Sequence, residues 1–304
     1  MPKITIGIPV RNGAAFLARA IDSVLAQTFE DFEVLIADNA STDATPAICE
    51  DYARRDRRVR YVRHRENIGS VANFNLLFST ASSEYFKWAS HDDLLAPTFI
   101  ETGLRELEGD PTLVLYSPNT LFIEEDGTPF SAGTEKDTFV DRSGRCWYSP
   151  TYRDAGLASH DPTDRFEAVM RTINMCFEIF GVIRSAALRR TSLMGEYWGC
   201  DKVLLAELSL LGRYFEDPQR LFYWRYHPAQ SMRLSFRQQG WWTSGRRRTG
   251  YFQRSQKLLG YMNALRGKGL SWQQEMRCLR SMVHRSVKPG RIRQLLAESA
   301  GRPI

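Results

Sequence analysis

Cysteine is scarce in this 304-residue chain, and its five cysteines are scattered: Cys49, Cys146, Cys176, Cys200 and Cys278. None belongs to a Cys-x-x-Cys pair, which argues against a zinc site and against a disulfide framework. Met1-Pro2-Lys3 leads directly into an apolar segment that lacks the features of a signal peptide. No apolar run approaches the ~20 residues of a membrane-spanning helix. We therefore expect a protein of the reducing cytoplasm.

Two common nucleotide-binding motifs are also missing. The chain has no Gly-x-Gly-x-x-Gly after its first apolar segment and no Gly-x-x-x-x-Gly-Lys-Ser/Thr anywhere. Rossmann dinucleotide binding and P-loop chemistry are thereby disfavoured. The loop at 9–15, PVRNGAA, contains a single glycine. This weakens the hypothesis of a sugar nucleotidyltransferase, which would need a glycine-rich basic loop at this place.

What the chain does have is an uneven distribution of charge. Residues 1–230 carry 25 basic and 33 acidic side chains, whereas residues 231–304 carry 16 basic and 2 acidic ones, a net charge of +14. Basic blocks suit anionic surfaces. No nucleic-acid-binding motif accompanies the charge, so we expect no nucleic-acid partner. The pattern predicts an acidic globular body followed by a basic region.

The first 110 residues alternate short apolar segments with amphipathic ones. Strands are predicted at 3–9, 32–37, 59–62 and 84–89, and helices at 14–27, from about 44 to 55, at 71–81 and after Pro97. Such alternation predicts an α/β fold with a doubly wound, mainly parallel sheet.

The regular alternation of predicted strands and helices ends after Thr112. We predict two strands and a turn within 113–130, a long surface loop at 131–162, and a strand at 177–183 that follows a helix at 165–172. A helix at 201–211 and two short strands, 214–216 and 221–226, come next. Beyond Arg233 only helices are expected.

Polar residues follow each of the predicted parallel strands: Pro9 to Asn12, Asp38-Asn39, Asn67 and Asp92-Asp93. Ligands of open α/β sheets lie at the carboxyl ends of the strands, so these groups should gather at one edge. Two adjacent carboxylates repel each other, and a Mg²⁺ or Mn²⁺ ion bridging to phosphate would offset that cost. Each group alone is explained as well by turn or helix-cap chemistry. Together they predict a metal–nucleotide site.

Four segments resemble family 2 glycosyltransferases, which have the GT-A fold. They are ITIGIPVRNGAAFLARAIDSVLAQTFEDFEVLIADNASTDAT at 4–45, NIGSVANFN at 67–75, WASHDDLLAP at 88–97 and EYWGCDKVLLAELSLLG at 196–212. The resemblance covers roughly residues 3–230, and the motifs are specific as an ordered set. It implies a catalytic domain at 1–232, with a nucleotide-binding half at 1–117 and an acceptor half at 118–232, followed by a basic helical region at 233–304.

The resemblance also implies roles for individual residues. Pro9 and Asn12 would lie near base and ribose, Asp38 or Asn39 would contact the base, and Asn67 would belong to the nucleotide site. Asp92 and Asp93 would hold the ribose and a divalent metal on the diphosphate, with His227 reaching the metal or the diphosphate. Asp201 would be the general base, although as an isolated residue it is explained more simply as the N-cap of the helix that follows, a role compatible with that of a base.

Two departures from the family pattern bear on these roles. Ser90 and His91 stand where the family often has Asp, so His91 is an open candidate for the metal shell. Asn39 replaces a common second Asp, which leaves the base preference open.

The implied function is inverting sugar transfer from a nucleotide-diphosphate donor, with a UDP-sugar favoured. A glycan or lipid-linked hydroxyl would be the acceptor, in cell-surface polysaccharide synthesis. The alternatives are a non-catalytic nucleotide- or glycan-binding module and a sugar nucleotidyltransferase.

The basic region contains a candidate amphipathic helix. Trp272, Met276, Leu279, Val283 and Val287 share one side, and Arg277, Arg285 and Lys288 lie on the other. Two interpretations compete: attachment to the inner face of an anionic membrane, and packing on the catalytic body or on a second subunit. We favour packing, because Trp241, Trp242, Tyr251 and Phe252 add many large apolar groups to the same region.

Overall fold

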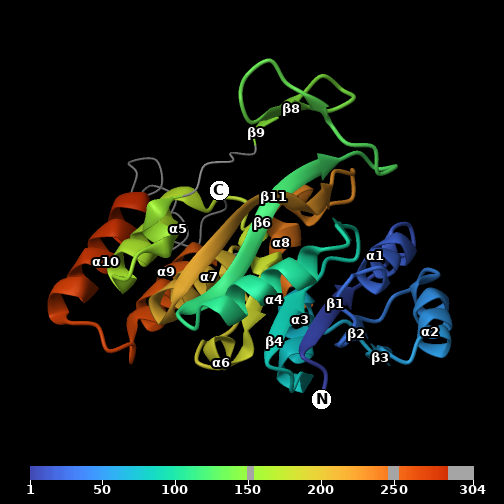
Figure 1. Cartoon of the computed structure of the whole chain (residues 1–304), viewed down its shortest axis with the longest axis horizontal. Coiled ribbons are helices and arrows are strands. Elements are labelled where there is room, and N and C mark those ends of the chain that lie inside the picture. Colours follow the sequence, from blue (N-terminus) through green and yellow to red (C-terminus); the bar gives the residue numbers. More distant parts are fainter. Residues whose placement is uncertain (149–153, 246–252, 287–304) are drawn as a thin grey trace.

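The structure is a computed structural model that describes residues 1–148, 154–245 and 253–286. Its centre is an eight-stranded sheet with the order β3-β2-β1-β4-β10-β6-β11-β5 (Figure 1). The strands are β1 Ile4–Val10, β2 Phe32–Asp38, β3 Val59–Arg63, β4 Tyr85–Trp88, β5 Leu94–Leu95, β6 Leu113–Ile123, β10 Val182–Arg184 and β11 Arg213–Arg225.

The sheet is mainly parallel, as the sequence predicts. β1 pairs in parallel with β2 and β4, β2 with β3, and β6 with β11, whereas β10 is antiparallel to both β4 and β6. Because β10 is antiparallel to both neighbours, β4 and β6 run in the same direction. β6 and β11 therefore point the same way as β1. The carboxyl ends of the long strands therefore lie at one edge of the sheet.

Helices cover both faces of the sheet and create two apolar cores. The helices of the first half are α1 Leu17–Leu25, α2 Thr45–Arg55, α3 Ser70–Thr80 and α4 Phe99–Gly109. Those of the second half are α5 Pro162–Thr172, α6 Ser185–Leu188 and α7 Cys200–Leu211. Side chains of α1, α2 and α4 pack with one face, and side chains of α3, α5 and α7 with the other. This is the predicted doubly wound arrangement.

Two strands are longer than the sequence predicts. β6 and β11 are each continuous, although each was expected in two pieces. The pairing register shifts between Asp217 and Arg220, so the strand bulges where Pro218 could not donate a ladder hydrogen bond. The strand predicted at 177–183 was largely wrong: Phe177–Phe180 forms a 3₁₀ turn, η2, and only β10 is extended.

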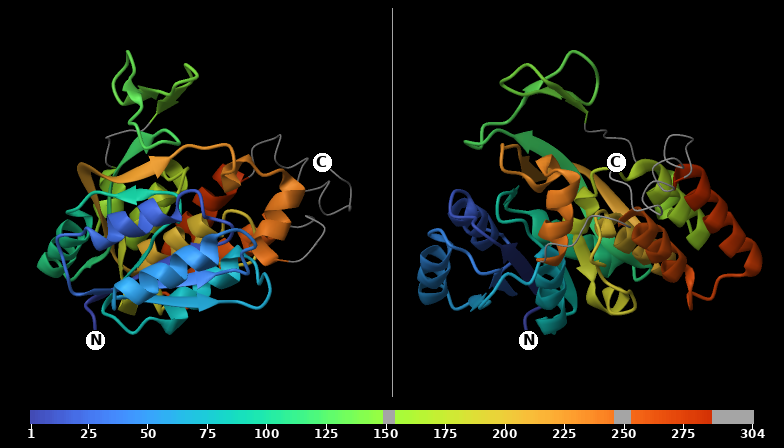
Figure 2. Two further views of the ribbon diagram at one scale, coloured as in Figure 1. Left: turned by 90° about the vertical axis from the view of Figure 1, so that its right-hand side faces the viewer. Right: turned by 180° about the vertical axis from the view of Figure 1, so that it is seen from behind.

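The segment predicted as a long loop contains structure of its own. β7 Ser131–Ala132, β8 Thr138–Val140 and β9 Cys146–Tyr148 form a small antiparallel sheet. It projects from the body in all views (Figures 1 and 2). The ring of Trp147 lies 5.6 Å from that of Trp224 and 4.8 Å from that of Tyr226, so aromatic contacts join this sheet to the end of β11.

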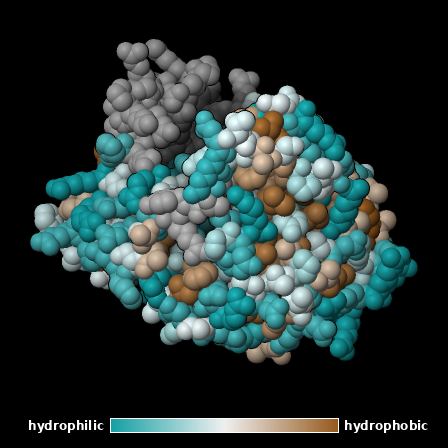
Figure 3. All heavy atoms as spheres, turned by 45° about the horizontal axis from the view of Figure 1, so that its top comes forward, coloured by the Kyte–Doolittle hydropathy of each residue, from teal (hydrophilic) through white to brown (hydrophobic). Residues whose placement is uncertain are grey.

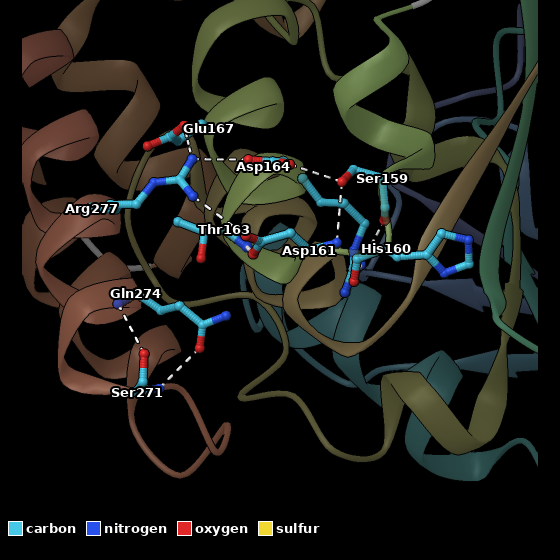
Figure 4. A network of polar contacts seen from close by, with 10 residues as sticks. Ser159, His160, Asp161, Thr163, Asp164, Glu167, Ser271, Gln274 and Arg277 are labelled. Carbon is cyan, nitrogen blue, oxygen red and sulfur yellow. Dashed lines mark hydrogen bonds and ion pairs between the residues drawn. The ribbon is translucent and has the colours of Figure 1, made fainter.

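The C-terminal region is helical, as predicted, with α8 Phe236–Ser244, α9 Gln253–Leu265 and α10 Trp272–Ser286. α9 packs on α7, and α10 packs on α5. Figure 4 shows Arg277 of α10 against three carboxylates: it lies 3.4 Å from Asp161 and 2.9 Å from both Asp164 and Glu167. The hydrogen bonds that Arg277 donates to Asp164 and Glu167 raise the pKa of Arg277 above its usual range. The basic region thus uses its charge partly to bind the acidic body.

The buried face of α10 differs from the predicted one. Cys278 and Met282 are buried, whereas Trp272 is 74% exposed and Val283 is 49% exposed. Helical periodicity locates an apolar stripe but does not reveal which part of it meets a neighbour. The predictions for Tyr251, Phe252, Val287 and Lys288 concern residues outside the described ranges.

The exposed surface is mixed in character. On the face in Figure 3, hydrophobic side chains gather in small groups among hydrophilic ones. Small exposed apolar groups are ordinary on protein surfaces and by themselves mark no docking site. Within the described parts of the chain, no helix is long and apolar enough to cross a membrane.

A buried ion pair ties the link between α9 and α10 to the body. The Nζ of Lys268 lies 2.7 Å from Oε1 of Glu207, and the two side chains are 8% and 4% exposed. Lys268 also donates to the carbonyl of Arg190, and Glu207 accepts from the amide of Ser192. The C-terminal region is therefore anchored by desolvated contacts, as the packing alternative expects.

We predict that Lys268→Ala lowers the free energy of unfolding by about 3 kcal/mol, because it leaves the carboxylate of Glu207 buried without its partner. Urea unfolding monitored by fluorescence would measure the change. The exposed neighbour Arg266 provides a control, and Arg266→Ala should stay within about 0.5 kcal/mol of wild type. Equal stability of the two variants would show that the Lys268–Glu207 ion pair contributes little to the stability of the fold.

Candidate active site

Chain topology brings the predicted site residues to the carboxyl edge of the sheet. β1 and β2 end in register, with Val10 opposite Asp38. β4 ends at Trp88, and the turn that carries Asp92 and Asp93 follows directly. β11 ends at Arg225, two residues before His227. The edge therefore collects side chains that are far apart in the sequence.

Asp92 is held by polar contacts on both carboxylate oxygens. Its Oδ1 accepts a hydrogen bond from Ser90, and its Oδ2 lies 2.9 Å from Nε2 of His227. Burial disfavours the ionised form, but nearby His91 and the hydrogen bonds from His227 and Ser90 outweigh it. The pKa of Asp92 consequently lies well below its usual range. Asp92 therefore carries a negative charge at the sheet edge.

Asp93 is the more buried member of the pair, with 6% exposure. Its Oδ1 accepts a hydrogen bond of 2.9 Å from the amide of Arg225. Burial and the adjacent charge of Asp92 raise the pKa of Asp93 well above its usual range. A dication beside Asp93 would reverse this effect, because it favours the ionised form of both carboxylates.

Arg225 is a site residue that the sequence analysis missed. It is fully buried, and its Nε donates to the carbonyl of Asp92 at 2.7 Å. Its Nη1 donates to the carbonyl of Glu125 at 2.7 Å, while its Nη2 is buried without a hydrogen-bond partner. Arg225 therefore fixes the Asp92–Asp93 turn against the loop after β6.

Both histidines lie beside the segment that leads into α1. The ring of His227 is 4.6 Å from that of Phe16, which fixes its orientation toward Asp92. His91 packs on Gly13, where a Cβ atom would lie 2.5 Å from Cδ2 of His91. A larger residue at position 13 would have to displace this ring or the side chain of Val10. The roles of both histidines toward a metal stay predictions.

Asp38 lies at the same edge but is fully buried. Its Oδ1 accepts from the amide of Ser41 at 2.8 Å, and its Oδ2 accepts from the hydroxyl of Tyr61 at 2.9 Å. The Nε of Arg63 is 3.6 Å from Oδ2. These contacts give Asp38 a clear structural task in shaping the loop after β2. The predicted base contact through this residue stays a prediction.

Asn39 and Asn67 are brought together by the fold. The Nδ2 of Asn39 donates to Oδ1 of Asn67 at 2.9 Å, and its Oδ1 accepts from the amide of Ile68 at 2.8 Å. The loops after β2 and β3 are therefore cross-linked by one amide pair. Pro9 is buried within β1, opposite Ala37.

Asn12 lies in the loop after β1, with a left-handed φ of 54°. Its side chain accepts from the amide of Thr42 at 2.8 Å, which joins the first and second loops. The exposed position of Asn12 is compatible with contact to a ligand.

The C-terminal region reaches this edge through α8. Arg11 stacks on Trp241 at 5.1 Å, and the rings of Trp198 and Trp242 are 5.9 Å apart. Gly69 and Gly245 approach each other so closely that a Cβ on Gly69 would lie 2.7 Å from the amide nitrogen of Gly245. Both glycines have positive φ angles, which other residues rarely adopt. α8 therefore covers the loop that carries Asn67.

Asp201 lies in the first turn of α7, as predicted. Its Oδ1 accepts from the amide of Lys202 at 2.8 Å. α7 is followed directly by β11, which starts at the opposite edge of the sheet. The start of α7 therefore lies toward the carboxyl edge, on the same side of the molecule as Asp92 and Asp93. The carboxylate is partly exposed and available to a ligand.

Two cavities differ in their relation to this edge. One of about 430 Å³ is lined by Phe16, the neighbour of His227, and by Arg19 and Arg142 among others. A larger one, about 610 Å³, is lined by Leu113 and Tyr214 at the starts of β6 and β11. We associate the smaller cavity with the site, because only its lining adjoins the polar edge.

A family model supplies the decisive comparison, because the model for glycosyl transferase family 2 matches residues 5–176. The chain belongs to this family. The matched range contains β1 to β4 and the Asp92–Asp93 turn, whereas Asp201, Arg225 and His227 lie beyond it.

Similar proteins support the assignment. An uncharacterized glycosyltransferase of Rickettsia typhi is 38% identical over 100 residues, which span 33% of this chain and 30% of that protein. Glycosyltransferase GlyG of Streptococcus pneumoniae is 30% identical over 139 residues, 45% of this chain and 46% of that protein. The similarity thus spans less than half of either relative.

Solved structures agree on the GT-A-like fold. S. aureus TarS in complex with UDP is 13% identical with a TM-score of 0.64, and the match covers 97% of this chain and 78% of that one. The mannosyltransferase PcManGT from Pyrobaculum calidifontis, in complex with GDP-Man and Mn²⁺, is 15% identical with a TM-score of 0.59, covering 99% and 74%. At sequence identities this low, the similarity to these structures supports the fold alone.

A divalent cation fits the donor set at the sheet edge. Asp92 and Asp93 are adjacent hard oxygen ligands, and Asp93 lacks a charged partner within ion-pair distance among the described residues. No cluster of three or more metal-ligating side chains occurs in the described ranges. Asp92 and Asp93 would therefore supply only part of the ligands of a Mg²⁺ or Mn²⁺ ion, and phosphate and water would have to complete its coordination.

We predict that Asp93→Asn weakens UDP binding in the presence of Mn²⁺ by at least ~10-fold, because the isosteric amide keeps the contact to Arg225 but removes a charge from the cation site. Isothermal titration with Mn²⁺ and with EDTA would measure the difference. The exposed residue Asp31 offers the same substitution as a control. Affinity that is indifferent to EDTA, or unchanged in Asp93→Asn, would contradict metal binding at this turn.

Proposed function

We propose that the protein is an inverting glycosyltransferase, which transfers a sugar from a nucleotide-diphosphate donor to an acceptor hydroxyl. The observation that carries the proposal is the carboxylate pair Asp92–Asp93 at the carboxyl edge of a family 2 sheet, with Asp201 at the start of a helix toward the same edge. These groups supply the two things that transfer needs: charge compensation for the leaving diphosphate and a base for the acceptor.

The donor would bind along the edge from β2 to β4. In this proposal Pro9, Asn12, Asp38, Asn39 and Asn67 surround base and ribose. Asp92 contacts the ribose and, with Asp93 and His227, holds the cation. A bound Mg²⁺ or Mn²⁺ ion would neutralise charge that develops on the diphosphate. The contact between His227 and Asp92 keeps that carboxylate oriented and ionised.

Asp201 would take the proton of the acceptor hydroxyl as the oxygen attacks the anomeric carbon. The bond from that carbon to the diphosphate breaks, and the leaving group keeps the electron pair. Because one base and no protein nucleophile are used, the reaction is a single displacement that inverts the configuration. A helix start is a rigid place for such a base.

UDP-sugars are the favoured donors. TarS was solved with UDP and with UDP-GlcNAc, and PcManGT with GDP-Man, so related folds accept either base. We propose a glycan or lipid-linked acceptor, in cell-surface polysaccharide synthesis at the cytoplasmic side. In this proposal the small sheet β7–β9 and helix α8 contact the acceptor, which is supported by the contacts of Trp147 with Tyr226 and of Trp241 with Arg11. A membrane-bound acceptor would favour peripheral attachment through basic side chains that are not engaged with α5.

A non-catalytic binding module is the main alternative. It would preserve the nucleotide site without needing Asp201 at the edge. The presence of both the Asp92–Asp93 pair and Asp201 in the described fold favours a catalytic function. A nucleotidyltransferase is disfavoured, because the loop after β1 carries one glycine that packs on His91 rather than a glycine-rich phosphate cradle.

We predict that Asp201→Asn leaves UDP affinity unchanged and lowers sugar transfer by ~10²-fold or more, because it removes the general base without altering the nucleotide site. The assay is UDP or GDP release from a panel of nucleotide sugars with Mn²⁺, with and without glycan acceptors. The exposed Glu196, five residues earlier, is the next candidate for the base, so Glu196→Gln is tested beside it. Full activity of Asp201→Asn would show that another residue is the general base.

A further inference from the structure

A second carboxylate, Glu178, lies near Asp201 and has no task in the scheme above. It belongs to η2, which follows Cys176 in the left-handed conformation and precedes β10. Because β10 runs antiparallel to β4, its start lies at the carboxyl edge of the sheet. Lys87 of β4 donates to the carbonyl of Phe180, which fixes η2 beside the strand that leads to Asp92. Glu178 therefore lies at the same edge as the Asp92–Asp93 pair and Asp201.

The immediate contacts of Glu178 connect it to the start of α7. η2 packs against α7, whose first turn carries Asp201. The Oε2 atom of Glu178 is buried and has no hydrogen-bond partner. A buried carboxyl oxygen without a partner is costly, so proteins retain one where a ligand or a proton completes it.

Titratable groups on several neighbouring elements surround Glu178. Asp201 and Lys202 face it from α7, Tyr214 from β11, and Cys176 from its own segment. Lys257 of α9 acts on the same Cys176 thiol. Burial is the main influence on Glu178 and raises its pKa to about 7, whereas a hydrogen bond from its own backbone amide and the charge of Lys202 lower the pKa, and the charge of Asp201 adds a smaller increase.

We propose that Glu178 and Asp201 form one proton-accepting carboxylate pair, in which Glu178 is a positioning residue that acts through Asp201. This inference rests on the proposed function. The acceptor O–H bond breaks, the proton passes to Asp201, and the pair then carries one negative charge instead of two. An ionised Glu178 thus makes the uptake of the proton more favourable, because it relieves the repulsion between two carboxylates.

The proposal has a definite pH signature. Below about pH 7 Glu178 holds a proton of its own and gives Asp201 no assistance, so the rate should rise as pH passes through the pKa of Glu178. Glu178→Gln mimics the protonated form at every pH. Its rate should match wild type near pH 5.5 and fall ~10-fold below it at pH 8.5.

The kinetic experiment follows UDP or GDP release from UDP-GlcNAc, UDP-glucose and GDP-mannose with Mn²⁺ between pH 5.5 and 9. It compares wild type, Glu178→Gln, Asp201→Asn and the surface control Glu50→Gln. A folded Glu178→Gln protein whose rate rises through pH 7 like that of wild type would overturn the proposal. Full activity of Asp201→Asn would instead refute the proposed general base.

A second measurement does not need activity. A carboxyl group whose pKa is higher in the folded than in the unfolded chain loses stability as pH rises from its unfolded pKa of about 4.5 to about 7. Urea unfolding of wild type should show this decline, and Glu178→Gln should lack it. In an Asp201→Asn background the decline should shift to lower pH, because the neighbouring charge is gone. A decline that Asp201→Asn leaves unmoved would show that the two carboxylates are not a pair, whatever the donor.

Discussion

The repulsion between Asp92 and Asp93 is the constraint on which much of the site depends. Two carboxylates at the end of a buried strand are stable only when the fold compensates their charge. Ser90 and His227 compensate Asp92 through hydrogen bonds, and the amide of Arg225 compensates Asp93. Arg225 is itself held by the carbonyls of the β6 loop. The continuous strands β6 and β11 therefore matter for the site, because they deliver Arg225 and His227 to the turn after β4.

The first half of the fold was predictable from the sequence because its signals are local. Strand and helix periods in the first 110 residues lie within windows of a few residues, and the polar groups that end each strand follow directly. The edge position of Asp92 and Asp93 then follows from parallel topology alone. Arg225 could not be found in this way: it meets Asp93 across 132 residues of sequence, and its neighbours read as an ordinary strand.

The same limit explains the errors in the second half. Phe177–Phe180 has the composition of a strand, yet the left-handed Cys176 and the packing of η2 on α7 turn it into a 3₁₀ segment. Glu178 consequently points to a different environment than a strand would give it. In α10 the helical period was right, but the face that meets α5 is selected by Arg277 and its three carboxylates, which come from another helix (Figure 4). Interactions between elements decide such features, and sequence periodicity does not contain them.

Asp92 and Glu178 are two acidic residues near the sheet edge whose surroundings act on their charge in opposite ways. At Asp92 hydrogen bonds and a neighbouring histidine favour the ionised form, which suits a carboxylate that must attract a cation. At Glu178 burial favours the protonated form more strongly than its own amide and Lys202 favour the ionised one, which suits the role proposed for it beside Asp201. One residue type is thus adapted to cation binding in one place and to proton transfer in another by its surroundings alone. Because η2 rests on both β4 and α7, a shift of this short segment would disturb both environments together.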